Sequence, residues 1–138
     1  MNYKIISKFI KDISFEIPDA KSYVMLEKEI GNYNLNFDIK SKPFKDKIIE
    51  VNTILRIVPN QDVKNKILFE INYSSLVSIE EDFKNKEEIE KIILIKIPND
   101  IYPTIYEIFK YLFSQAGIKN IQIDKEVDFE KMYSERKK

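Results

Sequence analysis

Residues 31–40, GNYNLNFDIK, alternate between apolar and polar side chains without a break. Side chains of a β-strand point to its two faces in turn, whereas a helix repeats every 3.6 residues, so this pattern predicts a half-buried strand. One face then carries Tyr33, Leu35, Phe37 and Ile39. The chain must therefore build a sheet with one apolar and one polar face.

Three further segments show a period of two and predict strands of the same kind. They are residues 8–17, 47–59 and 66–79. The polar stretches SKPFKD at 41–46 and NQDVKN at 60–65 predict turns, and residues 18–30 show no clean period and are expected to be a mixed connection. Because parallel neighbours need crossovers of a dozen or more residues, strands joined by short turns predict a four-stranded antiparallel meander.

The second half of the chain predicts helices, which makes the fold class α+β. From residue 80 the apolar period lengthens towards 3.6, with interruptions expected at Pro98 and Pro103. A long main helix is predicted from Pro103 to Gly117, and a short terminal helix is predicted after Asp128, a suitable N-cap. There is no repeat or linker, so residues 1–138 are expected to form a single domain.

Composition excludes several kinds of chemistry. The chain has no His and no Cys, so the common zinc sites, thiol nucleophiles and Ser-His-Asp relays cannot be built. Its two glycines, Gly31 and Gly117, cannot form a phosphate-binding loop. The remaining Asp, Glu, Lys, Tyr and Ser residues form no close constellation, so we expect neither an enzyme nor a cofactor.

The charge balance and the hydropathy indicate the cellular location of the chain and the kinds of partner that it does not bind. The 23 basic and 23 acidic residues cancel, so no overall field attracts nucleic acid or an anionic membrane. No segment approaches the roughly 20 apolar residues of a membrane span, and the N-terminus does not resemble a signal peptide. A cytoplasmic protein without nucleic-acid binding or membrane insertion is expected.

Two acids in the first predicted strand are unexpected for a buried element. A period of two places Asp12 and Glu16 on one face together with Ile10. At about 3.3 Å per residue the two carboxyl groups lie roughly 13 Å apart, which is too far for acid–base chemistry between them. A solvated strand face is the simplest interpretation. In the fourth strand Leu68 and Glu70 likewise share a face.

Four segments carry a resemblance to a known family, and they occur in this order over nearly the whole chain: IKDISFEIPDA, ILFEINYSSLVSI, IPNDIYPTIYEIFKYLFSQAGI and VDFEKMY. In these segments the chain resembles SecB, the bacterial protein-export chaperone family. The resemblance implies a dimer of dimers, in which eight-stranded sheets sandwich the main helices. It also implies an ATP-independent holdase that keeps unfolded preproteins export-competent and passes them to the motor ATPase SecA.

The resemblance also implies site residues. The family contacts SecA through the flat outer sheet, at positions that correspond here to Asp12, Glu16, Leu68 and Glu70. These residues would form a local acidic surface for a basic partner, which needs no net charge. Grooves lined by aromatic residues would hold clients, and the candidates are Tyr23, Leu26, Tyr33 and Phe37.

Two other functions stay open. Members of the family are usually acidic and often end in an acidic tail, whereas this chain is neutral and ends in SERKK. That difference leaves room for a SecB-like chaperone dedicated to another client, such as an antitoxin of a toxin–antitoxin system. An adaptor that binds one folded partner through the acidic face, without holding unfolded chains, is the other alternative.

Overall fold

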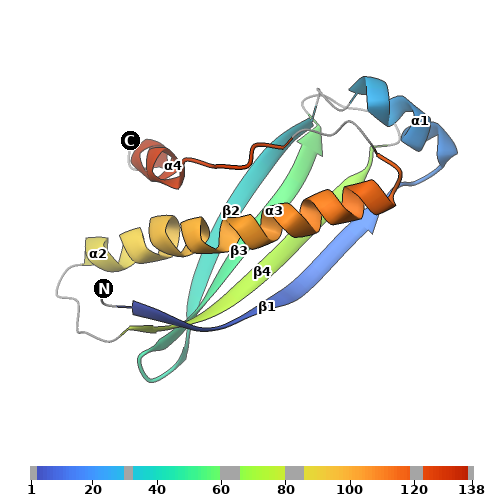
Figure 1. Cartoon of the computed structure of the whole chain (residues 1–138). Coiled ribbons are helices and arrows are strands. Elements are labelled where there is room, and N and C mark those ends of the chain that lie inside the picture. Colours follow the sequence, from blue (N-terminus) through green and yellow to red (C-terminus); the bar gives the residue numbers. More distant parts are fainter. Residues whose placement is uncertain (1–2, 30–32, 60–65, 80–85, 119–122, 137–138) are drawn as a thin grey trace.

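The computed structural model describes residues 3–29, 33–59, 66–79, 86–118 and 123–136. The turn predicted at 60–65 and residues 80–85 of the predicted helical run lie outside the described residues. A four-stranded antiparallel sheet is crossed on one face by a long helix (Figure 1). The predicted α+β class, with a long helix followed by a short terminal one, is confirmed.

The sheet contains strands β1 (Tyr3–Glu16), β2 (Tyr33–Lys45), β3 (Ile48–Pro59) and β4 (Leu68–Ile79). Their order across the sheet is β1-β4-β3-β2, and every neighbouring pair is antiparallel. Strands β2, β3 and β4 thus form a meander, while β1 lies beside β4 instead of β2. Both β1 and β2 are edge strands.

The second strand is longer than its alternation indicates. It continues through the stretch predicted as a turn at 41–46, and the chain reverses only after Lys45. Pro43 lies opposite Ile49 within this strand. Proline lacks the N–H that a central strand needs on both sides, but an edge strand can place that position towards solvent, so β2 tolerates it.

The connection between β1 and β2 contains a helix, α1 (Ala20–Glu29), which the sequence pattern did not predict. Asp19 begins it: its Oδ1 accepts hydrogen bonds from the backbone N–H of Ser22 at 2.8 Å and from the Ser22 hydroxyl at 2.7 Å. These bonds lower the pKa of the Asp19 carboxyl, the backbone one most. In Figure 1 the helix lies at one end of the sheet, where it carries the chain towards the far edge.

The long helical run is continuous, so the interruptions expected at Pro98 and Pro103 are wrong. It comprises α2 (Lys86–Lys91), a π-helical segment η2 (Ile92–Lys96) and α3 (Ile97–Gln115). The π turn ends at Lys96, and Pro98, which has no N–H to donate, lies in the first turn of α3. Pro103 lies inside α3 and has no N–H to donate to the carbonyl of Asn99, four residues earlier. Both residues are exposed, so water can satisfy that carbonyl.

Both predicted helix boundaries near the C-terminus are confirmed. Gly117 follows α3 with a φ of 85°, a conformation that favours glycine, and the Ile118 N–H donates to the Phe113 carbonyl at 3.0 Å. The last helix, α4 (Phe129–Arg136), begins after Asp128, whose Oδ1 accepts a hydrogen bond from the Lys131 N–H at 2.9 Å.

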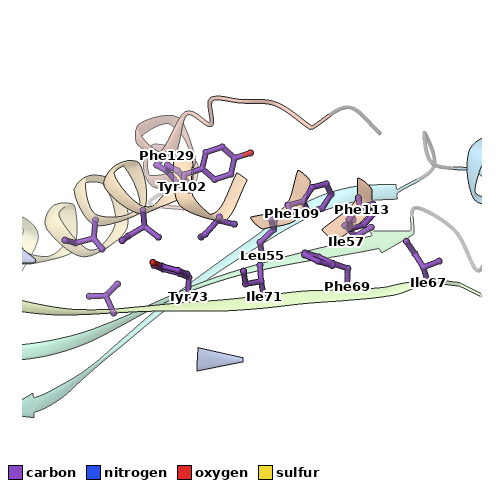
Figure 2. Close-up of a cluster of buried hydrophobic side chains, with 14 of the residues drawn as sticks. Leu55, Ile57, Ile67, Phe69, Ile71, Tyr73, Tyr102, Phe109, Phe113 and Phe129 are labelled. Atoms are coloured by element: carbon purple, nitrogen blue, oxygen red, sulfur yellow. The ribbon is translucent and has the colours of Figure 1, made fainter. Parts of the chain in front are cut away.

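The core lies between α3 and one face of the sheet. Figure 2 shows Leu55, Phe69 and Ile71 projecting from their strands towards the helix that carries Phe109 and Phe113. All five side chains are essentially inaccessible to solvent. This inner face uses the apolar half of each alternating strand. Among the described elements, none covers the opposite, outer face of the sheet (Figure 1).

Candidate protein-binding surfaces

The four residues assigned to the partner face lie together on the outer side of the sheet. Glu16 of β1 is paired directly with Leu68 of β4, and the next outward residue of β4, Glu70, is paired with Ser14. Asp12 follows along β1, opposite Asn72. Leu68 is 48% exposed, which is high for a leucine in a sheet. The structure therefore presents one exposed apolar side chain with Glu16 and Glu70 beside it and Asp12 further along β1 on the same face.

A β-bulge in β1 changes which residues share this face. The register shifts between Ile10, which pairs with Tyr73, and Asp12, which pairs with Asn72. Tyr73 and Asn72 are consecutive and point to opposite faces, so Ile10 lies on the inner side and the prediction that it shares the face of Asp12 is wrong. Lys11 is the extra residue at the bulge.

The extra residue makes an ion pair across the outer face. Lys11 Nζ donates to Glu50 Oε2 on β3 at 2.7 Å, and Asn52 Nδ2 donates to the same oxygen at 2.7 Å. The hydrogen bond from Lys11 is the larger cause of the lowered pKa of the Glu50 carboxyl, and the bond from Asn52 adds to it. The negative charge of the nearly buried Glu50 is thus balanced by the positive charge of Lys11.

A second ion-pair cluster lies at Glu70. Arg56 of β3 pairs with Glu70 in the sheet register, and its Nε donates to Glu70 Oε1 at 2.5 Å. Arg56 Nη1 also lies 4.0 Å from Asp38 Oδ2 on β2, and Lys40 Nζ lies 3.7 Å from the same oxygen. One arginine therefore bridges carboxylates of the two strands that flank its own.

The uncompensated negative charge is concentrated at the β1 side of the face. Asp12 and Glu16 are exposed, and neither has a basic group of the described chain within 4.0 Å. Glu70, in contrast, already has Arg56. The acidic surface predicted from the sequence is therefore two free carboxylates and one neutralised carboxylate.

The four candidate client residues do not form one exposed groove. Tyr23 is exposed on α1, although its hydroxyl donates to the Gly117 carbonyl at 2.8 Å. Leu26 is 2% exposed and belongs to the core, so the structure does not place it on the surface. Tyr33 and Phe37 are half-buried, and Phe37 packs edge-on against Tyr102 and Phe129.

Other apolar residues are better exposed, and periodicity alone did not single them out. Val24 is 63% exposed and stands with Tyr23 and Met25 on α1. A separate cavity of about 210 Å³ lies between β2, η2 and α4. Its apolar lining is Phe37, Ile39, Leu94, Phe129 and Met132. Residues from elements distant in sequence meet here, so only the tertiary structure reveals the cavity.

These surfaces are typical of a protein-binding module, here built on one antiparallel sheet. Among the described residues, no group of three or more acidic side chains is arranged to hold a metal ion. No helix in the described part of the chain has both the length and the apolar character needed to cross a membrane.

Comparison with known proteins places the chain in a family. The family model described as preprotein translocase subunit SecB matches residues 1–138. The putative protein-export protein SecB of Pelagibacter ubique is 46% identical over 135 residues, covering 98% of this chain and 96% of the relative. SecB of Anaplasma phagocytophilum is 26% identical over 145 residues, covering 96% and 91%. The chain therefore belongs to the SecB family of protein-export chaperones.

A solved structure shares the fold. The SecB-like chaperone of Mycobacterium tuberculosis, in complex with a peptide from the HigA1 antitoxin, superposes with a TM-score of 0.69 and covers 91% of this chain and 88% of its own. The two sequences are only 13% identical, so this likeness concerns the architecture.

Proposed function

We propose that this protein is an ATP-independent holdase of the cytoplasm that binds unfolded preproteins, keeps them competent for translocation and delivers them to SecA. The observation that carries the proposal is the match to the SecB family over all 138 residues, together with the 46% identity to an export protein. Binding of unfolded chains needs exposed apolar surface, and it requires no bound nucleotide.

Clients and SecA would bind two different surfaces of the molecule. Clients would bind the apolar side chains of α1 (Tyr23, Val24 and Met25) and the β2 surface near Tyr33 and Phe37. Several weak apolar sites on one assembly gain affinity for a long unfolded chain by avidity. SecA would bind the outer face at Asp12, Glu16, Leu68 and Glu70, on the side of the sheet away from α3. A client and SecA can then be bound together.

One alternative has support of its own. The Mycobacterium tuberculosis chaperone of the same fold binds an antitoxin peptide, so a dedicated antitoxin client is a second candidate. Its sequence is 13% identical to this chain, against 46% for the export protein of Pelagibacter ubique. The sequence relationship therefore favours export.

Adding the purified protein to an aggregation-prone substrate diluted from denaturant, without ATP, should suppress light scattering. We expect the double substitution Val24→Ser and Met25→Ser to weaken this suppression by about threefold or more, because it removes two exposed apolar contacts. Lys21→Ser, an exposed position on the same helix, is the matched control and should leave the suppression unchanged.

If the wild-type protein suppresses no aggregation at molar excess, the adaptor function is favoured over the holdase. If it does suppress aggregation but the α1 double variant does so equally well, clients bind elsewhere on the molecule.

We further propose a homotetramer, a dimer of dimers. Edge strand β1 carries three exposed apolar residues, Ile6, Phe9 and Ile10, and its free hydrogen-bonding edge suits pairing with another copy. Helix α3 would then lie between the two dimers. Light scattering coupled to gel filtration at micromolar concentration should give four times the mass of the chain, and a strictly monomeric mass would contradict this assembly.

A further inference from the structure

The outer face contains a basic residue, Arg56, that occupies a carboxylate which a basic partner could bind. Arg56 donates from Nε to Glu70 at 2.5 Å and lies 4.0 Å from Asp38, so its guanidinium occupies the place that a Lys or Arg of a partner would take on Glu70. The Arg56 side chain is 40% exposed and that of Glu70 is 31% exposed, so a partner can reach both.

We propose that Arg56 is a specificity-determining residue that lowers the affinity of the outer face for basic partners. This inference rests on the proposed partner face. A partner cation that engages Glu70 must first displace Arg56, and the displaced guanidinium then adds like-charge repulsion at the interface. Asp12 and Glu16 require no such exchange, because no described basic group pairs with them.

Arg56 can pair with Glu70 because of its position in the sheet register. Arg56 and Glu70 are directly opposite on β3 and β4, and cross-strand neighbours have their Cβ atoms about 5 Å apart. The guanidinium can therefore stay on Glu70 without a strained side chain. Lys40 carries the same charge on the same face, but it pairs with Asp38 at 3.7 Å instead of Glu70.

Arg56→Gln should therefore bind the SecA of the same host about three- to tenfold more tightly than the wild-type protein does. Calorimetry at low and moderate ionic strength measures the affinity, and circular dichroism confirms the fold of each variant. Lys40→Gln is the matched control, since it removes an equal charge from the same face. We expect it to change the affinity by less than about twofold.

A double-mutant cycle separates competition at Glu70 from a general charge effect. In a Glu70→Gln background the substitution Arg56→Gln should give no gain, because the carboxylate to be released is missing. Arg56→Met, which keeps an apolar stem of similar length, replaces Arg56→Gln if that variant does not fold.

Three results would overturn the inference. The first is unchanged or weaker binding by Arg56→Gln while reversal of Asp12 and Glu16 still weakens binding, which leaves the partner face intact and removes the competitor. The second is an equal gain in Lys40→Gln, which reduces the effect to net charge. The third is a wild-type protein that does not bind SecA, which removes the partner face itself.

Discussion

We expect reversal of the two free carboxylates, Asp12→Lys together with Glu16→Lys, to lower the proposed affinity for SecA by about 10- to 100-fold, or about 1.4–2.7 kcal/mol. Both side chains are exposed and uncompensated within the described chain, so a basic partner gains their full attraction. The reversal replaces attraction with repulsion at two places. Each single reversal, including Glu70→Lys, should have a smaller effect of the same sign.

Calorimetry with the SecA of the same host, at two ionic strengths, measures this loss. The wild-type affinity should fall as salt is added, because exposed charges are screened within about 10 Å at 0.1 M. Asp124→Lys with Glu126→Lys is the matched control, since it reverses two exposed acids outside the sheet. Wild-type affinity in the Asp12 and Glu16 variant would mean that these acids are only a solvated strand face.

Replacing Phe113 with alanine should cost about 3–5 kcal/mol of the free energy of unfolding. Its ring is fully buried and stacks on Phe109 at 4.2 Å and on Phe15 at 4.7 Å between centroids. It also meets Phe69 edge-on at 5.2 Å. The substitution opens a cavity where α3, β1 and β4 meet, and the two strands carry the candidate partner face.

Urea denaturation at a fixed protein concentration measures the loss. Phe113→Leu, which keeps most of the volume, should cost less and provides a folded variant if the alanine variant does not fold. Phe44→Ala removes a ring that is 52% exposed and should cost less than about 1 kcal/mol. Equal costs at Phe113 and Phe44 would contradict the assignment of the core.

The sequence was a good guide to elements whose buried side is large. The alternation in β2 and the apolar spacing of α3 were clear because each element packs one apolar side against the same core over many residues. Helix α1 buries only Ser22 and Leu26 among its described side chains, so it has almost no apolar period to detect. Its capping residue Asp19 was the available signal.

The site was predictable only in part, for a related reason. A period of two is enough to place Leu68 and Glu70 on one face. It does not show which strands are neighbours, so the pairing of Glu16 with Leu68 and of Arg56 with Glu70 required the sheet order. The ion pair that neutralises Glu70 therefore could not be seen, and the face was predicted to be more acidic than it is.

The bulge at Lys11 changes the phase of β1, and a second register shift between Ile5 and Ser7 changes it as well. Residues 7–10, between the two shifts, follow the opposite rule from residues 12–16 for which parity points inwards, as the pairing of Ile10 with Tyr73 and of Asp12 with Asn72 shows. When the chain is aligned with a relative that lacks the extra residue, an ungapped match would compare inward positions with outward ones along half of the strand. A one-residue gap placed at Lys11 restores the correspondence, so substitutions in the two halves of β1 can be judged against the correct face.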